Sequence, residues 1–258
     1  MLFNIVAVLA AASVSLAATP QGFKPASETP LLVSFSGIDA SGGKIVAKEA
    51  SQAQPQLATS SRLTGTSFAV LMIDLDIPTN SPPATNTLLH WMQTGLTQSS
   101  SATLLNTTAG RSNAFALQMP GAVAAAASYF GPSPPARVPL SHRYTELLID
   151  TSAASQESMS VLMQAAQSRQ GFNAEQVLTK AGLANKIVAG NFFNVTNPGP
   201  VQNVATGNST GGSGSARGTG TTNGPNQTTA PIRGSAVLQK TNSLLLGATV
   251  AGAALLIL

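Results

Sequence analysis

The sequence predicts a mainly β protein built on an antiparallel sheet, with a few helices late in the chain. Strand-like segments dominate residues 20–195, and the clearest are residues 31–36, 67–73, 87–94, 142–150 and 186–195. The second of these is apolar along almost its whole length, which indicates a central strand covered on both faces. Helix-like stretches come only later, at residues 156–169 and 173–182; the second has Asn173 as its expected N-cap and Gly182 as its stop. Strands and helices do not alternate, so a parallel βαβ sheet is not expected.

The composition excludes several classes of function. The chain has no cysteine and two histidines, which excludes disulfides, thiol catalysis and any metal site that needs three histidines. We therefore expect no metal and no cofactor. Of the 13 Lys and Arg residues, ten lie in residues 20–195 together with all nine Asp and Glu residues, and the other three are scattered further on. Because no basic patch results, nucleic-acid binding is not expected.

Both ends of the chain match processing signals. Residues 2–17 are apolar and uncharged and end in small residues, which is typical of a secretory signal peptide cleaved before Ala18. The alternative is an N-terminal core helix. Residues 243–258 are also apolar and uncharged, and they follow the small residues Gly234 and Ser235 and a short polar spacer. This layout predicts a GPI anchor on Gly234 or Ser235 and loss of residues 236–258, with a short tail anchor as the alternative.

Between these signals, the composition separates a folded part from a stalk. Residues 18–195 are long enough for one domain. Residues 196–235 consist almost wholly of Gly, Ser, Thr, Asn, Pro and Ala, which predicts a flexible stalk. In a secreted chain, the four N-x-[ST] sequons are expected glycosylation sites: Asn106, Asn194, Asn208 and Asn226. The two in the stalk should be the most accessible, and Asn194 beside an apolar strand less so.

The residues able to do chemistry lie on strand-like segments. Asp74 and Asp76 end the apolar segment and nominally share one face, while Tyr144 shares a face with His142. Taken singly, a strand histidine such as His90 is most simply a core residue, and paired aspartates before a proline most simply cap a turn. Together, two imidazoles and a phenol offer N–H and O–H donors to an anion. A carboxylate beside them should fix the imidazole tautomer and raise its pKa.

The order of these motifs resembles the phosphatidylethanolamine-binding protein family. The sequence contains Asp74-Leu75-Asp76-Ile77-Pro78, then His90-Trp91, then Gly131-Pro132-Ser133-Pro134-Pro135, and then His142-Arg143-Tyr144. The family carries a D-P-D-x-P element, a later H-W pair, and a G-x-x-P-P segment before H-R-Y. The resemblance extends over about residues 30–195, and residues 188–193 (VAGNFF) resemble the family's closing strand.

The resemblance implies a large central antiparallel sheet, a smaller sheet against it, and helices near the C-terminus. It also implies a small anion pocket lined by Asp74, His90, His142 and Tyr144, with Pro78, Gly131, Pro134 and Pro135 in its walls. A cis peptide bond before Pro78 is implied as well. The sequence departs from the family at the pocket mouth, because Leu75 replaces the first proline and the loop before His142 carries Pro139 and lacks the usual glycine.

Three functional hypotheses follow. The first is a cell-surface protein, attached to the membrane through a GPI anchor, that binds phosphate or a phospholipid headgroup. The second is a protease or kinase inhibitor acting by surface contact, since the family resemblance also covers such proteins. The third is a hydrolase that uses Asp74 with His90 or His142. Residues 18–195 contain no G-x-S-x-G, and the chain has no cysteine and no H-E-x-x-H, so binding is expected rather than catalysis.

Overall fold

The computed structural model describes residues 18–121 and 123–199. The predicted processing signals, the sequons at Asn208 and Asn226, and Gly234 and Ser235 lie outside these residues. The strands are β1 (Leu32–Phe35), β2 (Ile38–Asp39), β3 (Gln56–Thr59), β4 (Phe68–Pro78), β5 (Thr85–Gln98), β6 (Thr103–Thr107), β7 (Gly110–Gln118), β8 (Ser141–Asp150) and β9 (Ile187–Thr196). The α-helices are α1 (Gln156–Ala165) and α2 (Ala174–Lys180). No helix within these two ranges is long and apolar enough to cross a bilayer.

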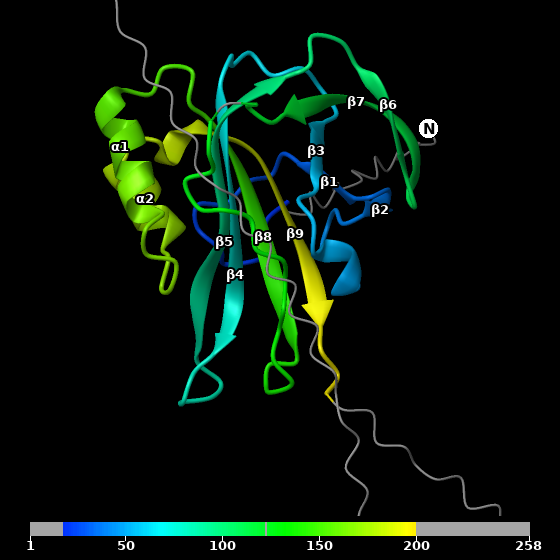
Figure 1. The fold of residues 1–258 in the computed structure, drawn as a ribbon, viewed down its shortest axis with the longest axis vertical. Helices are drawn as coiled ribbons and strands as arrows, with labels where there is room; N and C mark the ends of the chain where they lie inside the picture. Colours follow the sequence, from blue (N-terminus) through cyan, green and yellow to red (C-terminus); the bar gives the residue numbers. More distant parts are fainter. Residues whose placement is uncertain (1–17, 122, 200–258) are drawn as a thin grey trace, which may run out of the picture. The chain divides into compact units, whose positions relative to one another are not determined.

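All of these strands belong to one antiparallel sheet. Its order is β2-β1-β3-β7-β5-β4-β8-β9, and β6 pairs with β7 outside that path. The half that contains β4, β5, β8 and β9 continues into the half that contains β1, β2, β3 and β7 through only two residue pairs, between β5 and β7. The mainly β fold class is therefore confirmed. The large and small sheets of the prediction are the two halves of a single curled sheet (Figure 1).

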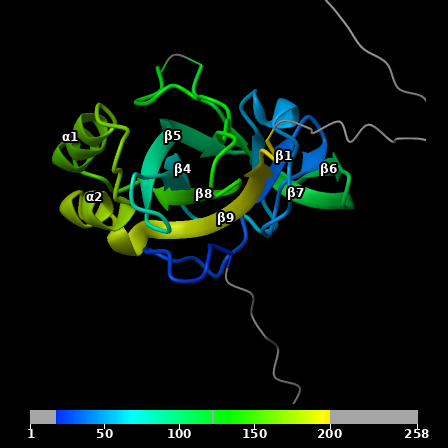
Figure 2. The same cartoon turned by 90° about the horizontal axis from the view of Figure 1, so that it is seen from below.

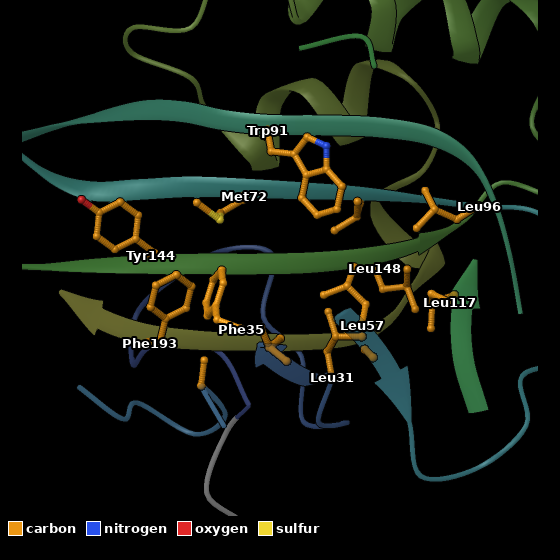
Figure 3. Packing of buried hydrophobic residues seen from close by; sticks show 14 of the residues in the cluster. Leu31, Phe35, Leu57, Met72, Trp91, Leu96, Leu117, Tyr144, Leu148 and Phe193 are labelled. Carbon is orange, nitrogen blue, oxygen red and sulfur yellow. The ribbon is translucent and has the colours of Figure 1, made fainter. Parts of the chain in front are cut away.

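The central half of the sheet is covered on both faces. Figure 2 shows α1 and α2 on one side of it and the smaller half of the sheet on the other. Along β4, Phe68, Val70 and Met72 point into the core between the two halves, whereas Leu71 and Ile73 point towards the helices. Figure 3 shows the first of these cores. Burying each such side chain contributes about 1.5–3 kcal/mol, which explains why a doubly covered strand is apolar throughout.

The helices begin where the sequence predicts, but α1 ends earlier. Asn173 caps α2, since its side-chain oxygen accepts a hydrogen bond from the Gln176 N–H at 2.9 Å. Gly182 follows α2 with a φ of +70°, which favours glycine. In contrast, α1 ends at Ala165 and does not reach Arg169. Arg169 instead accepts a hydrogen bond from the Leu89 N–H of β5 at 2.9 Å.

The structure also differs from the sequence analysis in three other places. The strands β2, β3, β6 and β7 were not predicted, and the outer strand β6 is largely exposed and has no long apolar run. The bond before Pro78 is not among the cis bonds of the described residues, which are Lys24–Pro25, Pro82–Pro83 and Val138–Pro139. Instead, β4 remains paired through Pro78, opposite Thr85. Finally, hydrogen bonds extend past residue 195, because the Asn197 N–H donates to Leu140 at 2.8 Å.

Candidate anion-binding site

Four of the predicted site residues converge at one end of the central strands. Asp74 on β4 lies directly opposite Tyr144 on β8, and His142 shares that face of β8. His90 approaches from β5, on the other side of β4, and its Nε2 lies 3.9 Å from Asp74 Oδ2. All four side chains belong to residues that are at most 1% exposed. Buried polar side chains from three strands, β4, β5 and β8, therefore lie together.

A β-bulge aims His90 at this site. The partner of Met72 is Trp91, whereas the partner of the next residue, Ile73, is Leu89, so His90 is an extra residue on β5. Strict alternation would place His90 and Trp91 on opposite faces. With the bulge, the His90 ring meets Tyr144 edge-on, with ring centroids 5.1 Å apart, while Trp91 also packs in the core on that face.

The Asp74 carboxylate lies at the centre of the site and accepts two hydrogen bonds. Its Oδ2 accepts a hydrogen bond from His142 Nδ1 at 2.8 Å, and its Oδ1 accepts one from the Asp76 N–H at 2.8 Å. Because a carboxylate oxygen accepts here, the proton of a neutral His142 lies on Nδ1. Its Nε2 is buried and has no hydrogen-bond partner among the described residues.

Phe130 holds the second imidazole in the same manner. His90 Nδ1 donates to the Phe130 carbonyl oxygen at 2.7 Å, since a carbonyl can only accept. The Phe130 N–H donates back to the His90 carbonyl at 3.1 Å, and the two rings stack with centroids 4.1 Å apart. His90 Nε2 is again buried without a partner in the described part of the chain. In the neutral form, both Nε2 atoms therefore present a lone pair, and each becomes a donor only when its ring is protonated.

Burial decides how His90 and Tyr144 ionise. It lowers the pKa of His90, and the Arg169 charge acts in the same direction, whereas the Phe130 carbonyl and Asp74 act against them. Asp74 therefore acts on the His90 ring in the expected direction, but desolvation outweighs the carboxylate, so the pKa of His90 is lowered and not raised. Burial and the charge of Asp74 raise the pKa of Tyr144 far above its ordinary value, so its hydroxyl keeps its proton and stays a donor.

Asp76 is not part of this cluster, although the sequence places it two residues from Asp74. A register shift between Asp74 and Ile77 breaks the alternation of β4. The Asp76 carboxylate instead binds Arg143, accepting from Nε at 2.8 Å, from Nη2 at 2.6 Å and from the backbone N–H at 2.8 Å. Burial alone would raise the pKa of Asp76, but these bonds and the Arg143 charge lower it below its ordinary value. Asp76 is therefore a structural anion that holds β8 beside β4.

The four residues predicted to form the pocket walls have different surroundings. Gly131 packs so closely on Gln52 that a Cβ would lie 2.7 Å from the Gln52 side chain, which excludes larger residues there. The Pro134 carbonyl accepts a hydrogen bond from Asn197 Nδ2 at 2.9 Å, and Pro135 is exposed. Pro78 lies at the end of β4, four residues beyond Asp74. The contact with the polar cluster is made by Phe130, directly before Gly131, which bonds and stacks on His90.

Sequence reasoning missed two residues that contact this site, Phe130 and Arg169. Phe130 precedes the proline-rich segment, and nothing in its local sequence marks it as a partner of His90. The sequence pattern predicts Arg169 as the last residue of a helix, but its guanidinium donates to the carbonyl oxygen of His90 at 3.2 Å. Both residues reach the site from irregular segments, where periodicity gives no signal.

Comparisons with known proteins identify the family of this chain. A family model described as phosphatidylethanolamine-binding protein matches residues 36–193. A curated relative, the phomoidride biosynthesis cluster protein N of Talaromyces stipitatus, is 33% identical over 213 residues, which cover 75% of this chain and 97% of the relative.

Two solved structures are also similar. A carboxypeptidase Y inhibitor, complexed with its cognate proteinase, is 18% identical with a TM-score of 0.45, over 65% of this chain and 83% of that one. A phosphatidylethanolamine-binding protein from Plasmodium vivax is 18% identical with a TM-score of 0.43, over 67% of this chain and 90% of that one. The family model and the curated relative each cover most of the described fold. The chain therefore belongs to the phosphatidylethanolamine-binding protein family.

Proposed function

We propose that this chain is a binding protein whose buried site takes up a small tetrahedral anion, a phosphate group either free or in a phospholipid headgroup, together with a proton. The observation that carries the proposal is the set of three polar atoms around Asp74: His90 Nε2, His142 Nε2 and the Tyr144 hydroxyl. All three are buried and have no hydrogen-bond partner among the described residues. Buried polar atoms are nearly always paired, so three unpaired atoms on residues that contact Asp74 or one another favour a ligand there.

The alternative functions differ from this proposal in measurable ways. An Asp–His pair with a free Nε2 is also the arrangement of a general base, which keeps the hydrolase hypothesis as a second candidate. Neither ring nitrogen bonds a serine or threonine hydroxyl in the described part of the chain, so we propose binding without turnover. Turnover that is lost in His142→Ala would favour the hydrolase. Protease or kinase inhibition that His142→Ala leaves intact would favour an inhibitor acting by surface contact.

Calorimetric titration tests the proposed function. At about pH 5.5, wild type should bind inorganic phosphate and phosphoethanolamine, and the ratio of the two affinities separates a free phosphate from a headgroup ligand. His142→Ala removes one charge-assisted hydrogen bond, so both affinities should fall about 10- to 150-fold. Tyr144→Phe removes a neutral donor and should cost roughly 2- to 10-fold.

A matched control shows whether these losses are local. Arg62→Ala removes an exposed cation outside the site, whose guanidinium donates only to the Ser100 carbonyl oxygen in the described chain. It should bind both anions like wild type. Phosphate affinity that is the same in His142→Ala and wild type, or no binding by wild type at all, contradicts the proposal.

We also propose that the mature protein is held at the outer face of the plasma membrane or cell wall by a GPI anchor. The two apolar, uncharged ends and the small residues Gly234 and Ser235 support this. Of the two sequons in the described ranges, Asn106 is exposed, whereas the Asn194 amide donates to the Gly43 carbonyl at 2.7 Å, so Asn106 is the better glycan acceptor. Phosphatidylinositol-specific phospholipase C should release the protein from membranes. Recovery of a peptide from residues 243–258 in the mature protein would contradict the anchor.

A further inference from the structure

Arg169 joins His90 to the loop that covers it. The Arg169 Nη1 donates to the carbonyl oxygens of Leu89 and His90, both at 3.2 Å, and Nη2 donates to the Ser128 carbonyl at 2.8 Å. Ser128 lies two residues before Phe130, which stacks on the His90 ring. One guanidinium therefore ties β5, at the bulge that carries His90, to the segment between β7 and β8 that walls the site.

The charge of Arg169 is not neutralised by a carboxylate. All nine Asp and Glu residues of the chain lie within the described ranges, and none of them forms an ion pair with Arg169. Arg143, in contrast, is fully engaged by Asp76. Arg169 is half-buried, so its charge is only partly screened by solvent. A half-buried cation without a counter-ion therefore lies against the backbone of a site residue.

The charge of Arg169 matters because an anionic group, Asp74, also lies beside His90. Asp74 faces the ring from β4, His142 and Tyr144 face it from β8, and Phe130 covers it. The carboxylate of Asp74 would by itself repel an incoming anion. A fixed positive charge nearby offsets that repulsion while both imidazoles are neutral.

We propose that Arg169 is the fixed cation and positioning residue of the anion site: its three carbonyl contacts hold the Phe130 wall against His90, and its charge offsets that of Asp74. This inference rests on the proposed function. The charge of Arg169 also lowers the pKa of His90, in addition to burial. This effect of Arg169 can be measured in the free protein, before any anion is added.

Two substitutions in the full chain separate the charge from the contacts. Arg169→Gln keeps a hydrogen-bond donor but removes the charge, and Arg169→Lys keeps the charge but loses the planar guanidinium. In the free protein, the pKa of His90, measured by NMR titration of its ring, should rise in Arg169→Gln and stay close to wild type in Arg169→Lys. At the acid plateau, where His90 is protonated in every variant, sulfate affinity should fall about 10-fold in Arg169→Gln and roughly 3-fold in Arg169→Lys.

An exposed arginine serves as the control for these two variants. Arg62→Gln, which removes an exposed cation elsewhere, should leave both readouts unchanged. If Arg169→Gln shifts neither the His90 pKa nor the plateau affinity, or if Arg169→Lys equals Arg169→Gln in both, the charge of Arg169 has no role in the site. If wild type binds neither sulfate nor phosphate, the proposed function fails, while the pKa of His90 in the free protein still shows whether Arg169 acts on it.

Discussion

Glu146→Gln should raise the free energy of unfolding by about 3 kcal/mol at about pH 8 and leave it nearly unchanged at about pH 4.5. Glu146 lies on β8, two residues beyond Tyr144, in register with Met72 on β4 and Asn191 on β9. It is 0% exposed. Its Oε2 accepts one hydrogen bond, from Asn191 Nδ2 at 3.0 Å, and its Oε1 has no partner among the described residues.

The sign of the effect follows from the buried carboxyl group. Burial raises the pKa of Glu146 from 4.5 to about 7, and the bond from Asn191 offsets only part of that rise. Between these values, the folded protein keeps a proton that the unfolded chain has released. The stability contributed by the protonated form is complete below about pH 4.5 and is lost as the pH rises through about 7. At about 1.4 kcal/mol for each pKa unit, the loss is about 3 kcal/mol, and the uncharged glutamine does not suffer it.

Urea denaturation of the full chain at the two pH values measures this effect. Glu157→Gln, an exposed change in the first turn of α1, is the matched control and should give the same small difference at both. The comparison between variants also cancels the opposite contribution of His90, whose lowered pKa removes stability as the pH falls. A Glu146→Gln chain that is less stable than wild type at about pH 8 would show that Glu146 is not an uncompensated buried carboxyl group.

Anion affinity should fall about 10- to 150-fold as the pH rises from about 5 to about 8. The Nδ1 protons of His90 and His142 are committed to Phe130 and Asp74, so each Nε2 can donate to an anion only in the cationic ring. Because burial lowers the pKa of His90, the free protein lacks that proton at neutral pH, and anion binding must be accompanied by uptake of a proton from solvent. Affinity therefore rises as the pH falls, until the pKa of the free ring is passed.

Sulfate is the appropriate probe for this dependence, because its own charge does not change over the range, unlike that of phosphate. His90→Ala and His142→Ala should each flatten the pH profile in calorimetric titrations. Tyr144→Phe should weaken binding with little change in slope, since the Tyr144 hydroxyl keeps its proton throughout. Equal sulfate affinity at both ends of the range would show that the two histidines are structural core residues.

The sequence predicts those parts of the fold that depend on local pattern. The apolar run of β4 indicates a strand covered on both faces, and the structure places one core on each side of it. The capping role of Asn173 can likewise be predicted from the sequence, because a helix cap is a contact between residues close together in the chain. That Asp74, His90, His142 and Tyr144 lie together is predictable only from the order of the motifs that resemble the family, because no local pattern indicates it.

The features that sequence reasoning missed depend on pairing between distant segments. Simple alternation puts Asp74 and Asp76 on one face, but a register shift in β4 leaves Asp76 bound to Arg143. Alternation also separates His90 from Trp91, whereas the bulge in β5 brings both to the same face. Such bulges are fixed by the partner strand, so the sequence of one strand does not reveal them. Arg169 is likewise not revealed by local sequence, because its hydrogen-bond partners lie 41 to 80 residues earlier.

The most direct test of the central claim is NMR of the two imidazole rings during a sulfate titration at about pH 6.5, the ordinary histidine pKa. The chain has only two histidines, so His90→Ala and His142→Ala assign both rings without ambiguity. Sulfate binding should move the Nε2 resonances of both rings towards those of protonated imidazole, while both Nδ1 atoms stay protonated. If sulfate leaves both Nε2 resonances unchanged, the buried histidines do not bind the anion, and the central claim is wrong.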